Sequence, residues 1–108
     1  AEQVLPAAAK SDMGVVMATV LGGGIYVEDE RQQEAVEKWY EGEEEQRRVC
    51  AIIEKMRKED STLPQSAFRW VLADERVSTV SSGAADIAQL QEVAQAGDME
   101  PLVMEFNK

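Results

Sequence analysis

Apolar residues recur three and four positions apart in several stretches of the chain, a pattern that predicts four to five helices. The stretches are residues 2–12, the charged segment before Gly42, residues 43–59, residues 63–73 and residues 86–97. The strongest stripe contains Val49, Ile52, Ile53 and Met56, at positions i, i+3, i+4 and i+7. Trp39 and Trp70 lie on two of the other stripes, so both are expected in the core.

Residues typical of helix ends support these assignments. Pro64 fits the first turn of its helix, and Asp86 is expected to cap the last helix with Gln89 as its capping-box partner. Gly42 interrupts the charged helical segment, and Gly97 ends the last helix. The helix boundaries are therefore set by local signals.

Two short apolar runs predict strands. The run Val15–Leu21 is continuous, which is typical of a strand buried on both faces, and residues 77–80 form a second strand. Residues 102–106 are a candidate extra strand. Because strands alternate with helices, the two main strands should pair in parallel through helical crossovers. The helical stripe at 49–56 is expected to cover one face of the first strand.

Length and charge restrict the possible functions. The chain has 108 residues, enough for one domain, and its 21 acidic against 11 basic residues give a net charge of −10. That charge disfavours partners such as nucleic acid or an anionic membrane. No apolar run is long enough to span a bilayer, and no signal peptide is recognised. Because the chain has a lone cysteine, a cytoplasmic location is expected. With no histidine and one cysteine, the chain has no histidine triad and no cysteine zinc site.

Individual candidate residues carry little chemistry by themselves. Gly22, Gly23 and Gly24 follow the first strand and could approach a phosphate, although a flexible turn is the simpler interpretation. The glutamates at 41 and 43–45 suit a solvated helix start better than a magnesium site. Tyr26 and Tyr40 are not linked by their spacing, and Cys50 is expected to be a buried small hydrophobe. We therefore expect no metal site and no catalytic residue.

Three segments resemble parts of aldo/keto reductases. The run 63–73, LPQSAFRWVLA, is similar to a late helix of that family, which often reads Thr-Pro-x-Gln-x-Ala-Leu-x-Trp-Val-Leu. The run 77–84, VSTVSSGA, resembles the eighth barrel strand, and 87–92, IAQLQE, the helix start that follows it. More weakly, residues 4–6 and 14–18 resemble the sixth helix and seventh strand, and 19–22 stands where the family has Ser-Pro-Leu-Gly. The resemblance covers about residues 2–96.

The resemblance implies an α/β fold that is part of a TIM barrel, with its last two strand–helix units. In the family these strand ends bind the nicotinamide cofactor, NADP(H) or NAD(H), while the catalytic residues lie in the first half of the barrel. The cofactor-binding positions that the resemblance implies are Thr19, Leu21, Gly22, Gly23, Ser81, Ser82, Gly83 and Ala84.

The sequence departs from the family pattern at positions that matter for the cofactor. Val20 replaces a proline, Ser81-Ser82 replaces Ile-Pro, and Val93 stands where an asparagine usually contacts adenine. Residues 84–86 replace a basic group that often holds the 2′-phosphate, and Asp86 would repel that phosphate. Any cofactor binding is therefore expected to be weak.

Three functional hypotheses follow. The first is a reductase-derived barrel fragment that self-associates and transfers no hydride by itself. The second is a small acidic interaction protein that acts through its strand edges or a helical stripe. The third is an oxidoreductase subunit that completes a barrel with a complementary chain. Because an apolar sheet face needs cover, a homodimer or higher homo-oligomer is the expected assembly.

Overall fold

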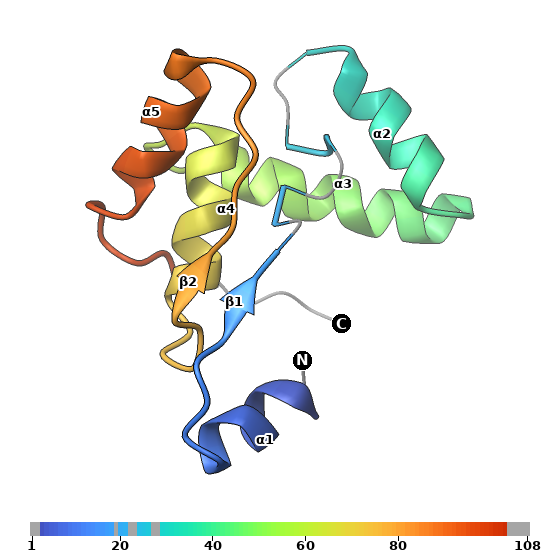
Figure 1. Cartoon of the computed structure of the whole chain (residues 1–108). Coiled ribbons are helices and arrows are strands. Elements are labelled where there is room, and N and C mark those ends of the chain that lie inside the picture. Colours follow the sequence, from blue (N-terminus) through green and yellow to red (C-terminus); the bar gives the residue numbers. More distant parts are fainter. Residues whose placement is uncertain (1–2, 19, 22–23, 27–28, 104–108) are drawn as a thin grey trace.

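The computed structural model describes residues 3–18, 20–21, 24–26 and 29–103. Five helices and two strands follow one another in this part of the chain (Figure 1). They are α1 (Val4–Lys10), β1 (Val16–Met17), α2 (Arg31–Trp39), α3 (Glu43–Arg57), α4 (Leu63–Leu72), β2 (Thr79–Val80) and α5 (Ile87–Ala96). The predicted α/β fold class and the predicted order of elements are therefore confirmed.

The two strands pair in parallel, as predicted, with Val16 opposite Thr79 and Met17 opposite Val80. The ladder continues slightly past them, because the Ser78 amide donates to the Val15 carbonyl over 2.9 Å and the Ser81 amide to the Met17 carbonyl over 2.8 Å. Both strands are shorter than predicted.

The reason for the short strands is the number of neighbours. A strand persists only where a neighbour supplies backbone partners, and β1 and β2 have only each other in the described part of the chain. The predicted strand 15–21 therefore ends at Met17, and Val20 and Leu21 lie in a turn.

The main core lies beside the sheet. It contains Ile25 and buried side chains from α2, α3 and the start of α4, namely Ala35, Val36, Val49, Ile53, Met56 and Leu63. The predicted stripe of α3 is thus an apolar packing face, but it packs against α2 and α4 rather than against a strand. The expectation that this stripe covers β1 is wrong, because α4 is the helix that contacts the sheet.

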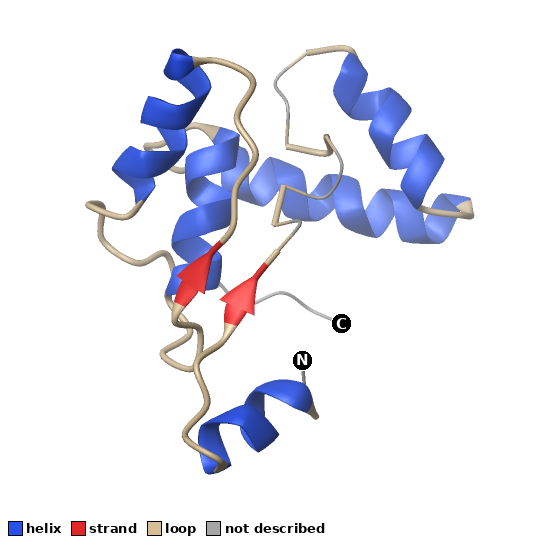
Figure 2. Cartoon of the chain, in the orientation of Figure 1, coloured by secondary structure: helices blue, strands red, loops and turns tan. Residues whose placement is uncertain are grey.

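Helix α4 is the centre of the fold. It packs against α3, α5 and β2, and Figure 2 shows it behind the strands, between the other helices. The side-chain amide of Gln65 donates a hydrogen bond to the backbone carbonyl of Glu92 in α5 over 2.9 Å. Arg69 donates to the Glu100 carbonyl over 2.8 Å, so α4 also holds the segment that follows α5.

Some sequence expectations about burial and the terminus are corrected. Trp39 is 57% exposed and Trp70 40% exposed, so neither is a core residue. Trp39 is the last residue of α2, and Trp70 lies in the last turn of α4. Residues 101–103 form no strand, and the rest of the predicted terminal strand, 104–106, lies outside the described residues. Within the described ranges, no helix is long and apolar enough to cross a membrane.

Candidate functional site

The carboxyl ends of β1 and β2 emerge at the same edge of the sheet because the strands are parallel (Figure 1). A cavity of about 310 Å³ lies at this edge, and Leu21 and Gly83 both line it. Ser81, Ser82 and Ala84 are exposed but do not line the cavity. The remaining predicted cofactor positions, Thr19, Gly22 and Gly23, lie outside the described residues.

Three helix starts complete the cavity wall. The remaining lining residues come from the segment before α2, the first turns of α2 and α4, and the first two turns of α5, and they are Tyr26, Asp29, Arg31, Pro64, Gln89, Glu92 and Val93. The cavity is therefore a mixed site, with apolar walls and a few polar groups.

The N-terminus of α5 is closed by its own cap. Asp86 accepts a hydrogen bond from the Gln89 amide over 2.8 Å, which confirms the predicted cap. The Gln89 side chain accepts from the Ala85 amide over 2.8 Å rather than from Asp86, so the second half of the predicted capping box is shifted by one residue. Because Asp86 already places a carboxylate at this helix end, the end does not offer its amides to a phosphate.

Arg31 is the cationic residue among those that line the cavity, and it is engaged. Its guanidinium donates to both carboxylate oxygens of Asp29, with the shortest distance 2.7 Å. The hydrogen bonds from Arg31 lower the pKa of Asp29, and the same contact raises the pKa of Arg31. With Glu92 also in the wall, the lining carries no free positive charge for a phosphate.

Tyr26 forms an aromatic part of the cavity wall, although the sequence analysis assigned this residue no role. Burial, and secondarily the charge that Tyr40 would carry, raise the pKa of Tyr26 above its ordinary value of 10.0. The phenol is therefore neutral at physiological pH and is a weak acid. Its place two residues after the glycine run was the one local signal that could have indicated it.

The glutamates of α3 do not gather into a site. Glu45 pairs with Arg48 over 2.9 Å along the helix, which is ordinary surface pairing. Among the residues that the structure describes, no group of three or more acidic, thiol or imidazole side chains is placed to hold a metal ion.

A larger and more open hollow of about 870 Å³ lies elsewhere. Its walls are mainly apolar and come from α1, β1, the end of α4 with the loop after it, and residues 102–103. It contains none of the predicted cofactor positions. Size alone therefore does not identify the functional site, and we place the candidate site at the smaller cavity, where the two strand ends meet.

Two parallel strands, joined through helices and flanked by a cavity at their carboxyl ends, are typical of α/β barrels and open α/β sheets, which bind ligands at that edge. The model of the aldo/keto reductase family matches residues 1–108, and the chain belongs to this family. No curated protein and no solved structure matches the chain. The family match confirms the resemblance found in the sequence, and the fold agrees with part of a TIM barrel.

Proposed function

We propose that residues 1–108 supply two neighbouring strand–helix units of an aldo/keto reductase barrel and, with them, part of the edge that holds a nicotinamide cofactor. The observation that carries the proposal is the cavity that Leu21 and Gly83 share, because it joins the ends of both strands. Family membership supports the cofactor class, since aldo/keto reductases usually use NADP(H).

The cavity suits an uncharged part of the cofactor better than its phosphates. Leu21, Pro64 and Val93 offer apolar contacts, and the Tyr26 ring adds an aromatic wall. The carboxylates of Asp29 and Glu92 and the engaged Arg31 give phosphate little attraction. A bound nicotinamide cofactor would supply the hydride, and the residues of this chain would contribute positioning only.

We also propose that the 108 residues transfer no hydride by themselves. Reduction of a carbonyl needs a proton donor whose pKa is tuned for transfer. The chain contains no histidine, and the raised pKa of Tyr26 makes its phenol a poor donor. Catalysis would then require residues outside this chain, as in the hypothesis of a complementary barrel-forming chain.

A titration with NADH and a substitution at Gly83 test the proposed function. A Cβ at Gly83 meets nothing within 4 Å, so Gly83→Leu should fill the cavity mouth without straining the fold. We expect a dissociation constant weaker than about 1 mM, which is under ~4 kcal/mol of binding. Gly83→Leu should weaken it at least about fivefold, whereas Ala88→Leu, on an exposed residue of α5 that does not line the cavity, should not.

Two results would contradict the proposal. One is NADH binding that Gly83→Leu leaves unchanged. The other is NADPH-dependent reduction of simple aldehydes by the purified chain, with turnover above the buffer blank that Tyr26→Phe abolishes.

A further inference from the structure

The segment before α2 contains a closed ion pair. The Asp29 carboxylate accepts from the Arg31 backbone amide over 2.9 Å and from Nε and a terminal guanidinium nitrogen of Arg31 over 3.1 and 2.7 Å. The aspartate therefore uses both oxygens on one arginine, in the bidentate geometry that holds a guanidinium most firmly.

The same three residues occur a second time. Asp-Glu-Arg stands at 29–31 and again at 74–76. In the second copy the Asp74 carboxylate accepts from the Arg76 amide over 3.0 Å and from its guanidinium over 2.9 and 2.6 Å. The motif by itself is thus a local turn that forms wherever the backbone allows it.

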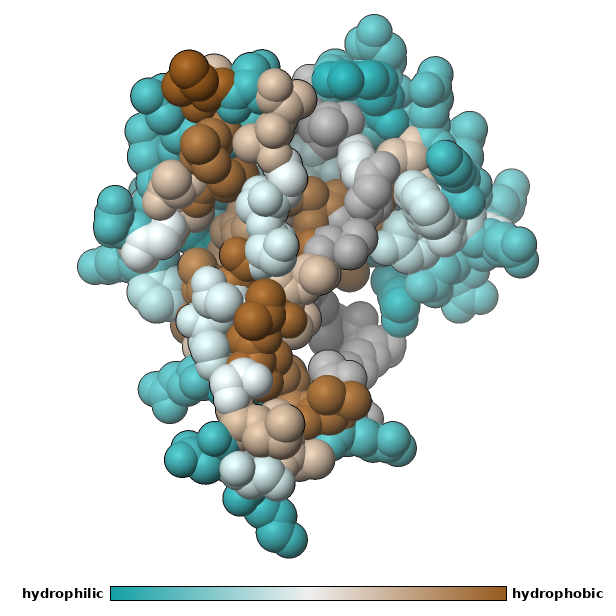
Figure 3. Space-filling view, viewed as in Figure 1, coloured by the Kyte–Doolittle hydropathy of each residue, from teal (hydrophilic) through white to brown (hydrophobic). Residues whose placement is uncertain are grey.

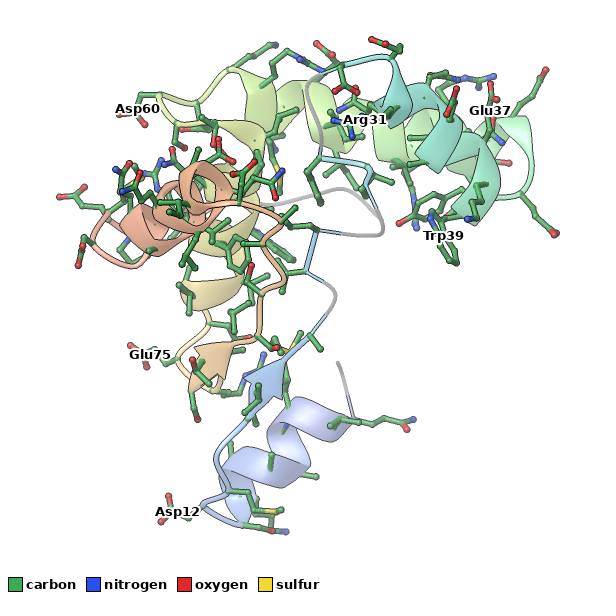
Figure 4. The ribbon with its side chains drawn as sticks, turned by 45° about the horizontal axis from the view of Figure 1, so that its top comes forward. Asp12, Arg31, Glu37, Trp39, Asp60 and Glu75 are labelled. Atoms are coloured by element: carbon green, nitrogen blue, oxygen red, sulfur yellow. The ribbon has the colours of Figure 1, made fainter. Side chains whose placement is uncertain are left out.

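The two copies differ in what surrounds them. Asp29 and Arg31 line the cavity at the strand ends, whereas Asp74 and Arg76 line the larger hollow. Figure 4 shows Arg31 and Glu75 in distant parts of the molecule. The second pair is therefore a natural control for the first, identical in chemistry and remote from the candidate site.

The position of the first pair determines the charge that a ligand meets. Without Asp29, the Arg31 guanidinium would lose its bidentate partner and could contact a phosphate. With Asp29 bound to it, the pair is neutral and Glu92 leaves the wall net negative. A cofactor that carries an additional phosphate, with about two more negative charges, is therefore disfavoured relative to the same cofactor without that phosphate.

We infer that Asp29 is a specificity-determining residue: by engaging Arg31 it sets the cavity to accept the unphosphorylated cofactor NAD(H) in preference to NADP(H). This inference rests on the proposed function, because it concerns the same cavity. The inferred preference for NAD(H) differs from the NADP(H) that the family usually uses. The residue that determines this preference, Asp29, precedes α2.

The test compares NADH and NADPH titrations, followed by the backbone amide shifts of the protein at low salt, where charge effects are least screened. Asp29→Asn keeps the size of the side chain and an oxygen for the Arg31 amide but removes the charge. We expect it to improve NADPH affinity relative to NADH about two- to fivefold, the size of one solvent-exposed charge pair. The matched variant Asp74→Asn should leave the ratio unchanged.

The possible failures are distinguishable. If the wild-type chain prefers NADPH, or if Asp29→Asn leaves the ratio unchanged while Gly83→Leu still weakens NADH, the inference about Asp29 is wrong and the cavity assignment stands. If neither nucleotide binds, or if Gly83→Leu changes neither affinity, the proposed function fails and the inference fails with it. Far-UV circular dichroism on every variant shows whether the helices are retained.

Discussion

Several charged side chains form ion pairs with residues two or three positions away in the sequence. Arg76 donates hydrogen bonds to Asp74 and lowers the pKa of that carboxyl from 3.8 to about 2. Asp29 is affected in the same direction by Arg31. Sequence inspection could have found the repeated Asp-Glu-Arg, but not that one copy lies in a cavity wall, because that depends on where α2 packs.

The pKa of Asp74 gives a prediction about acid stability. A carboxyl whose pKa is lower in the folded state contributes stability above pH 3.8, and this contribution is lost as the pH falls toward about 2. The pair is partly exposed to solvent, so we expect at most about 1 kcal/mol from it.

A carbon-detected NMR titration of the Asp74 carboxyl measures this pKa directly. Arg76→Gln should move the value up toward 3.8 and shift the acid limb of the unfolding curve to higher pH. A wild-type value near 3.8 that the substitution leaves in place would show that the bridge does not form in solution.

At the scale of helices and strands, local signals were sufficient for the helix ends and insufficient for the strands. Asp86 and Gly97 mark α5 almost as the sequence predicted, because caps depend on neighbouring residues. The extent of β1 and the partner of the α3 stripe were predicted wrongly, because both depend on contacts between residues far apart in the chain.

The N-terminal cap of α4 is more complete than that of α5, and the loss of the α4 cap should be measurable. Thr62 accepts from the Gln65 amide over 3.3 Å, and the Gln65 side chain accepts from the Thr62 amide over 3.2 Å. Thr62→Ala should lower the free energy of unfolding by about 1 kcal/mol. Because α4 contacts α3, α5 and β2, the loss should affect the whole cooperative transition.

Urea denaturation checks this prediction, with Ser82→Ala as the control. Ser82 is exposed and lies in no helix or strand, so its loss should change stability by less than about 0.5 kcal/mol. Equal changes in the free energy of unfolding from the two substitutions would show that the capping box of Thr62 and Gln65 does not stabilise the start of α4.

At the scale of the whole molecule, the cavity unites positions that the sequence could only suggest separately. Leu21 and Gly83 were expected at the strand ends because parallel strands end together. Arg31, Pro64 and Glu92 were not foreseen, since three different helix starts must pack together before they share a wall. Positions that depend only on the order and direction of the strands could be predicted from the sequence. Positions that depend on how the helices pack could not.

The surface of the molecule bears on its assembly. Apolar side chains gather over α5, the strands and α1 on one face (Figure 3), and Val16 of β1 is 63% exposed. This exposure supports the expectation of a homo-oligomer or of a complementary barrel-forming chain, and both stay predictions. In the α3 stripe, by contrast, Val49, Ile53 and Met56 are buried and Ile52 packs against the same core, so most of this stripe is already covered within the chain.

Chemical-shift mapping with NADH tests the central claim most directly, because it locates the binding site on the folded chain. We predict that backbone amide shifts concentrate at Leu21, Gly83 and Val93 around the strand-end cavity, while Val77 and Val103 in the larger hollow stay unchanged. Shifts that concentrate at Val77 and Val103 instead, or no concentration-dependent shifts even at NADH concentrations well above about 1 mM, would contradict the assignment of the cofactor edge.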